Sequence, residues 1–144
     1  MTTPPEPGTV AERELCGLVN TLARQLDDHV RARAATLDLT GPQATALREL
    51  DGPMTMKQLA ARMGCEPSNA TFVVDRLERR GLIERRPHPT DRRARELHLT
   101  APGGALRARL VDLLTQHSPV AALTGQEQAA LRLLLERAVG RDQR

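Results

Sequence analysis

Residues 55–100 read TMKQLAARMGCEPSNATFVVDRLERRGLIERRPHPTDRRARELHLT. The start of this stretch favours a short helix, because Leu59 and Met63 lie four residues apart and fall on one face. Thr55 and Gln58 have the spacing of a capping box, in which each side chain satisfies a backbone N–H that the first turn leaves free. The sequence therefore predicts a helix that begins directly after Thr55.

A turn and a second helix follow. Gly64 is the residue type most at ease in the left-handed conformation that ends a helix. Pro67 is tolerated only in a first helical turn, so we predict a second helix over residues 67–80, ended by Gly81. Two short helices joined in this way form a helix-turn-helix, whose second helix lies in the major groove of DNA.

The second helix is predicted to have an apolar face and a polar face. Its apolar positions are expected to pack on the first helix: Ala70, Val73, Val74 and Leu77. Asp75 and Glu78 are interpreted as solvated surface beside Arg76 and Arg79. The free faces of a recognition helix carry side chains that reach base edges and phosphates. We assign that role to Ser68, Asn69, Thr71, Phe72, Arg76 and Arg79.

A basic hairpin pattern comes next. Leu82 and Ile83 open a strand, and Leu97 and Leu99 alternate on the return strand. Residues 62–95 carry nine arginines against five acidic residues, whereas the whole chain has a net charge of +3. Such a surface fits a phosphate backbone, although it can also serve only to keep a small domain soluble. In the hairpin we assign DNA contact to Arg86, Asp91, Arg92, Arg93 and Arg95.

Over roughly residues 12–140 the chain resembles the MarR family of winged helix-turn-helix regulators. The segments that carry the resemblance are LTGPQATALREL from Leu39, LAARMGCEPSNAT from Leu59, VDRLERRGLIER from Val74, DRR from Asp91 and LTAPG from Leu99. The resemblance implies an obligate homodimer that binds a pseudo-palindromic operator in double-stranded DNA, usually as a repressor, and is often released by a small molecule or an oxidant. It also implies that Arg93 enters the minor groove and that Asp91 holds the wing in shape.

The implied fold is mainly α with a small β-hairpin wing. Its parts are a flexible segment over 1–10, a dimerisation helix over 11–38, a winged helix-turn-helix lobe over 39–101 and C-terminal dimerisation helices over 102–140. The terminal helices carry apolar stripes that the small winged helix-turn-helix lobe cannot cover. The stripes are Leu15, Leu18, Val19, Leu22, Leu26 and Val30, then Leu106, Leu110, Leu113 and Leu114, then Leu131, Leu133, Leu134, Leu135 and Ala138. A partner chain is the simplest cover, and an intrachain helical bundle is the alternative.

Composition argues against several other functions. A single aromatic residue, Phe72, leaves no platform for stacking single-stranded nucleic acid. No apolar run approaches the length of a membrane span, and the proline-rich start is unlike a signal peptide, so we expect a cytoplasmic protein. Neither a phosphate loop nor a nucleophile elbow occurs, so we expect no catalytic residues and no cofactor. A winged helix that binds only other proteins is an alternative function.

Two cysteines are candidates for oxidant sensing. Cys16 lies near the start of the first helix, where the organic-peroxide branch of the MarR family has its sensing cysteine, but that branch also uses tyrosines, which this chain lacks. We interpret Cys16 as a small buried packing residue, with an oxidant-sensing repressor as the alternative. Cys65 precedes a predicted helix N-terminus, which favours a thiolate, and is interpreted as structural.

The histidines show no ligand spacing with one another or with the cysteines, so no metal site is predicted: His29, His88, His98 and His117. His98 alternates with two leucines and is expected to face solvent. In the MarR family, small-molecule effectors lodge between the dimerisation helices and the reading lobe. That resemblance places a candidate effector pocket near His29 and Arg33, with no ligand class indicated.

Overall fold

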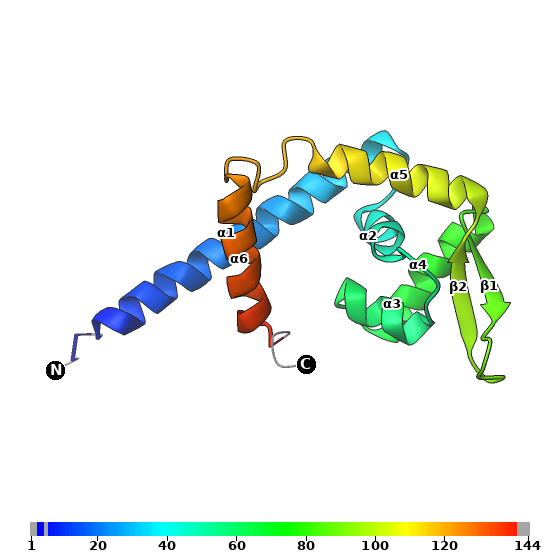
Figure 1. Cartoon of the computed structure of the whole chain (residues 1–144), viewed down its shortest axis with the longest axis horizontal. Coiled ribbons are helices and arrows are strands. Elements are labelled where there is room, and N and C mark those ends of the chain that lie inside the picture. Colours follow the sequence, from blue (N-terminus) through cyan, green and yellow to red (C-terminus); the bar gives the residue numbers. More distant parts are fainter. Residues whose placement is uncertain (1–2, 5, 141–144) are drawn as a thin grey trace.

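The computed structural model describes residues 3–4 and 6–140 of the chain. Within that part the fold is mainly α, with one small hairpin (Figure 1). The elements are α1 (Pro7–Thr36), α2 (Gly41–Glu49), α3 (Met56–Met63), α4 (Pro67–Arg79), β1 (Ile83–Pro87), β2 (Arg95–Leu99), α5 (Ala101–Thr115) and α6 (Gly125–Ala138). None of the helices described combines the length and the apolar character that crossing a membrane requires.

The first helix begins earlier than the sequence pattern indicated. α1 starts at Pro7, because proline suits a first helical turn, where its missing N–H is not needed. Residues 7–10 are therefore helical, and the prediction of a flexible segment over 1–10 was wrong for them. The rest of that segment includes residues outside the described part: Met1, Thr2 and Pro5. α1 is an unbroken rod of 30 residues.

The helix-turn-helix forms as predicted. Gln58 N–H donates to Thr55 Oγ1 at 3.2 Å and Thr55 N–H donates to Gln58 Oε1 at 2.9 Å, which completes the capping box that starts α3. Gly64 ends α3 with a φ of 67°, in the left-handed region. α4 then opens at Pro67. The buried residues of α4 are the four predicted ones, Ala70, Val73, Val74 and Leu77.

The wing is the antiparallel hairpin of β1 and β2, in a register that places Ile83 opposite Leu99. Leu97 is buried, and its backbone also pairs with the segment before α3, where its N–H donates to Met54 O at 2.7 Å. This bridge fixes the wing beside the helix-turn-helix. The two leucines predicted to share one face of the return strand both contact the core, Leu97 as a buried member and Leu99 as a partly buried side chain packed against it.

His98 differs from the prediction that it faces solvent. Its side chain is only 18% exposed, and Nε2 lies 2.8 Å from Glu96 Oε1. The reason is that His98 shares one side of the hairpin with Glu96 and with Glu84, its partner on β1, so the three side chains cover one another. Alternation along a strand predicts on which face of the hairpin a side chain lies, but it does not predict whether other side chains on that face cover it.

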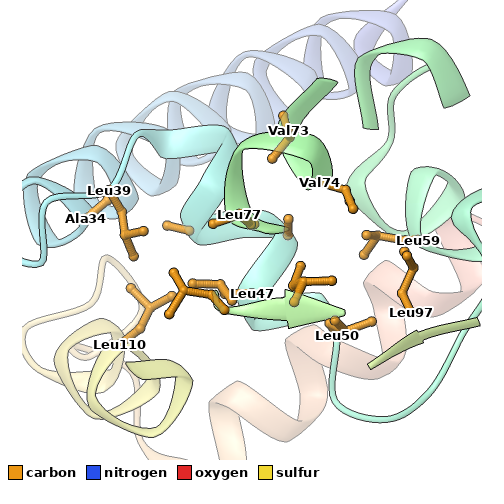
Figure 2. Close-up of a cluster of buried hydrophobic side chains, with 14 of the residues drawn as sticks. Ala34, Leu39, Leu47, Leu50, Leu59, Val73, Val74, Leu77, Leu97 and Leu110 are labelled. Atoms are coloured by element: carbon orange, nitrogen blue, oxygen red, sulfur yellow. The ribbon is translucent and has the colours of Figure 1, made fainter. Parts of the chain in front are cut away.

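The core lies where α2, α3, α4, the wing and α5 meet (Figure 2). Its largest fully buried side chains are Leu47, Leu50, Leu59, Leu77, Ile83, Leu97, Leu110 and Val74. The last turns of α1 join the same cluster through Ala34, which is completely buried. Each large aliphatic side chain buried there contributes about 1.5–3 kcal/mol to stability. The helix-turn-helix, the wing and the ends of α1 and α5 therefore share one core.

α5 belongs to this core rather than to a surface remote from the reading lobe, so that part of the dimerisation prediction was wrong. Leu110 is fully buried, and the other leucines of its stripe pack against the same cluster: Leu106, Leu113 and Leu114. The reason is a close backbone approach at the start of α5. Thr100 N–H donates to Leu82 O at 3.1 Å, and a Cβ on Gly103 would stand 1.9 Å from that same oxygen.

α6 stands apart from the core. It begins with the predicted capping box, in which Thr124 N–H donates to Glu127 Oε1 at 2.9 Å. That backbone hydrogen bond holds the pKa of the Glu127 carboxyl below its usual value. None of the residues of α6 is buried within the described chain. Uncovered apolar surface therefore remains on α6 and on the first part of α1.

Candidate nucleic-acid interface

α4 presents a free face opposite its buried one. Of the six residues assigned to DNA contact on this helix, five are exposed: Ser68, Asn69, Phe72, Arg76 and Arg79. Thr71 is half-buried, and its hydroxyl donates to Pro67 O at 2.9 Å. The N-cap residue, Glu66, makes no side-chain capping bond, and its backbone oxygen accepts the N–H groups of Asn69 at 3.0 Å and Ala70 at 3.2 Å.

Two side chains on this face contact each other. The Phe72 ring is 61% exposed, and Arg76, one turn further along α4, lays its guanidinium over the ring with Cζ 4.6 Å from the ring centroid. This is a cation–π contact, which is attractive at such a distance. The only aromatic side chain of the protein and a basic side chain therefore form one unit on the surface of α4.

The tip of the wing is held by hydrogen bonds from its own side chains. His88 Nδ1 accepts the backbone N–H groups of Thr90 at 3.2 Å and of Asp91 at 3.1 Å. Asp91 Oδ1 accepts the N–H of Arg93 at 3.0 Å. Asp91 therefore shapes the turn that presents Arg93.

The arginines at the wing tip form no ion pairs within the described chain. Arg92, Arg93 and Arg95 are exposed, and no carboxylate among residues 3–4 and 6–140 forms an ion pair with any of them. Arg86, lower on β1, is different because it pairs with Glu84 on the same strand. The uncompensated positive charge therefore lies at the tip, where a phosphate backbone or a groove can reach it.

Arg85 joins the wing to α4. Its guanidinium forms ion pairs with Asp75 and, at 3.7 Å, with Glu78 Oε2. Both carboxylates stay largely exposed, as the interpretation of them as solvated surface expected, but their partner is Arg85 of the wing rather than the neighbouring arginines of α4. Sequence reasoning missed Arg85 because the pairing depends on how the hairpin folds back on the helix. The one available signal was that the two carboxylates lie three residues apart, and so on one side of α4.

A cavity of about 600 Å³ lies between α1, α2 and α4. Its lining residues are Asp27, Val30, Arg31, Gly41, Pro42, Thr45, Met63, Cys65, Asn69, Phe72 and Val73. The candidate pocket residues His29 and Arg33 do not line it. They face the end of α5 instead, where His29 Nε2 lies 2.8 Å from Leu114 O and Arg33 donates to Gln116 O at 3.2 Å.

The two cysteines are free thiols in different surroundings. Cys16 is exposed on α1, so the single chain does not bury it as the sequence interpretation expected. The reason is that the first part of α1 has no neighbouring element of its own chain against which to pack. Cys65 is half-buried and lines the cavity. In the part of the chain that the structure describes, no three side chains of His, Cys, Asp or Glu are grouped so as to hold a metal ion.

The sequence and the fold are both similar to those of known proteins. The sequence model of the MarR family matches residues 39–94, which run from the approach to α2 through the tip of the wing. The chain belongs to the MarR family. As a MarR-family protein it is a DNA-binding transcriptional regulator with a winged helix-turn-helix, and not an enzyme.

Similar proteins cover different shares of this MarR-family chain. The HTH-type transcriptional regulator YkoM of Bacillus subtilis (strain 168) is 32% identical over 89 residues, which are 60% of this chain and 58% of YkoM. The organic hydroperoxide resistance transcriptional regulator of the same organism is 27% identical over 87% of this chain and 89% of its own length. The crystal structure of a mutant MarR from E. coli complexed with operator DNA superimposes with a TM-score of 0.71 at 26% identity, covering 87% and 93% of the two chains.

Proposed function

We propose that this MarR-family chain is a homodimeric repressor that binds an inverted-repeat operator and is released by a small molecule. The observation that carries the proposal is the combination of an exposed recognition helix with a wing tip whose arginines have no acidic partner in the described chain. On α4 the proposed contacts are Ser68, Asn69, Thr71, Phe72, Arg76 and Arg79, and on the wing they are Arg86, Asp91, Arg92, Arg93 and Arg95.

Binding to an inverted repeat is tested by gel shift on the intergenic DNA beside the gene. We expect affinity to fall steeply with salt and to favour one inverted repeat over random duplex. Asn69→Ala is expected to cost about 1–3 kcal/mol at the operator and to leave binding to random DNA nearly intact, because the amide reads a base edge. Thr71→Val is the matched comparison: because its hydroxyl donates to Pro67 O rather than standing free to read a base, any loss that it causes should be equal on operator and random DNA. Weak binding to every sequence would instead support a protein-interaction module.

The dimer is supported by where apolar surface stays uncovered. In the described chain, nine of the ten large hydrophobic side chains that are exposed belong to α1 or to α6 and its C-cap. They are Val10, Leu15, Leu18, Val19, Leu26, Leu133, Leu134, Leu135 and Val139. Figure 1 shows the first half of α1 extending away from the lobe that carries α4 and the wing. A two-fold interface buries the same stripe on both protomers at once.

Leu18→Glu is expected to convert a dimer at micromolar concentration into monomers, because Leu18 is 68% exposed in the single chain and a carboxylate there would be buried at the interface. Analytical ultracentrifugation measures the change. Asn20→Glu is the matched control, since it adds the same charge on the far side of the same helix and should leave the dimer intact. A wild-type protein that sediments as a stable monomer would contradict both the dimer and the inverted repeat.

Release by a small molecule is supported by the cavity beside α4. Its volume of about 600 Å³ is in the range of ligand pockets, and its walls mix apolar side chains with the charges of Asp27 and Arg31. Asn69 and Phe72 form part of the wall, so an occupant would touch the helix that reads DNA. The same gel shift, repeated with candidate ligands, tests release from the operator.

A further inference from the structure

We propose that Phe72 determines sequence specificity by contacting the methyl group of a thymine, and that its ring holds Arg76 for a guanine in the adjacent base pair. The inference rests on the proposed operator binding and adds to it the bases that are read. Each half-site of the operator would then contain a thymine next to a guanine, and the Phe72–Arg76 pair would recognise that step.

The first observation is the exposure of Phe72. It is the only aromatic residue of the chain, and 61% of it is exposed on the free face of α4. The other large hydrophobic side chains exposed in the described chain lie on α1 or on α6 and its C-cap. Phe72 is therefore the one such apolar group on the face that carries Ser68 and Arg79. The major groove of DNA presents one apolar group, the C5-methyl of thymine.

The second observation is the state of Arg76. Its guanidinium lies over the Phe72 ring, and in the described chain it has no ion pair with a carboxylate. Asp75, the adjacent carboxylate, is engaged by Arg85 of the wing. Arg76 therefore keeps its full charge, and stacking limits the orientations that its planar group can take. A guanidinium ordered before binding loses less entropy when it forms two parallel hydrogen bonds.

The distance between the two groups is compatible with neighbouring base pairs as their targets. Arginine donates in bidentate fashion to O6 and N7 of guanine, the commonest specific contact in the major groove. The Arg76 Cζ lies 4.6 Å from the Phe72 centroid, which is close to the rise of about 3.4 Å between successive base pairs. Two groups so spaced along the groove can engage neighbouring base pairs. A thymine methyl under Phe72 and a guanine edge at Arg76 satisfy both side chains.

The alternative is that Phe72 only closes the cavity, whose wall it shares with Val30 and Val73. That role and the proposed one have different consequences. A wall residue affects stability or ligand binding, whereas a residue that reads a methyl group makes affinity depend on that methyl group. Removing the methyl group from the DNA and measuring affinity therefore distinguishes a cavity-wall residue from a residue that reads thymine.

The experiment starts from full-length dimer and an operator enriched by selection from random duplexes. Each thymine is then replaced by deoxyuridine, which removes only the methyl group, and each neighbouring guanine by 7-deazaguanine, which removes only N7. For the wild type we expect one symmetric pair of thymines whose joint replacement weakens binding about tenfold, since each methyl contact is worth roughly three- to fivefold. The adjacent guanines are expected to be sensitive to 7-deazaguanine.

The variants assign these sensitivities to residues. Phe72→Ala should bind thymine and deoxyuridine operators equally and should weaken the guanine effect, whereas Phe72→Leu should keep the methyl effect and lose only the coupling to Arg76. Arg76→Ala should abolish the effect of 7-deazaguanine. Arg79→Ala is the control, since it removes an exposed arginine of the same helix and should leave both sensitivities unchanged.

Two results would overturn the proposal, and they are distinguishable. If Phe72→Ala remains folded by circular dichroism and keeps the methyl sensitivity of the wild type, Phe72 does not read thymine. If selection with the wild type enriches no sequence at all, operator binding itself is wrong, and the assignment of the bases is wrong with it. A cavity-wall role would show as a loss of thermal stability in Phe72→Ala with an unchanged pattern of base sensitivity.

Discussion

Gly103→Ala is expected to destabilise the protein by about 3 kcal/mol, a large part of the 5–15 kcal/mol that holds a typical domain folded. A Cβ at this position would stand 1.9 Å from Leu82 O and 2.9 Å from Leu82 C, so the obstruction is backbone rather than a side chain that can turn aside. The same carbonyl accepts the Thr100 N–H, which ties the wing to the start of α5. Chemical denaturation followed by circular dichroism measures the loss.

Gly104→Ala is the matched control for this prediction. A Cβ on this adjacent glycine would meet open space, with no heavy atom within 4 Å. Because alanine is preferred over glycine inside a helix by roughly 0.5–1 kcal/mol, this variant should be slightly more stable than the wild type. Equal stability of the two variants would show that α5 does not approach Leu82 as closely as described.

Arg93→Ala is expected to weaken operator binding by roughly 1.5 kcal/mol per wing, the strength of a hydrogen bond to a charged group. Since the proposed dimer carries two wings, the slope of log affinity against log salt should fall by about 2, one for each lost contact. Asp91→Ala should weaken binding as well, although it removes a negative charge. The physical reason is that Asp91 Oδ1 accepts the N–H of Arg93 at 3.0 Å and shapes the turn around it.

Asp91→Asn separates the hydrogen bond from the charge. Its amide oxygen can still accept the Arg93 N–H, so this variant should bind the operator at least as tightly as the wild type. Fluorescence anisotropy over a salt series measures all three variants. Tighter binding by Asp91→Ala, or an unchanged affinity and salt slope for a dimeric Arg93→Ala, would mean that the wing is only a solvated hairpin.

The helix-turn-helix was predictable because its determinants are local. The capping box of Thr55 and Gln58, the left-handed Gly64 and the helix start at Pro67 each act within a few residues of chain, and the structure confirms them. The apolar face of α4 follows from helical periodicity alone. The roles of the individual DNA-contact residues remain predictions, since they depend on a partner.

What sequence reasoning missed depends on contacts between distant parts of the chain. Leu110 was placed on a dimerisation surface because periodicity shows that a stripe is buried, but not against what. Arg85 of the wing pairs with Asp75 of the preceding helix, and His29 of α1 reaches Leu114 of α5. The position of the cavity likewise follows from how α1, α2 and α4 meet. These features require the packing of whole elements, which short-range patterns do not specify.

The course of α1 has a mechanical consequence for the proposed dimer. Its first half offers uncovered leucines to a partner, while Ala34 near its end is sealed in the core that holds the recognition helix. The helix is about 45 Å long, with its first half at the proposed dimer interface and its last turns in the core beside α4. A tilt of about 5° about one end displaces the other end by about 4 Å. That travel is close to the spacing of one base pair, about 3.4 Å. In the proposed dimer, a small change in the angle of α1 would therefore displace α4 relative to its half-site by about the spacing of one base pair.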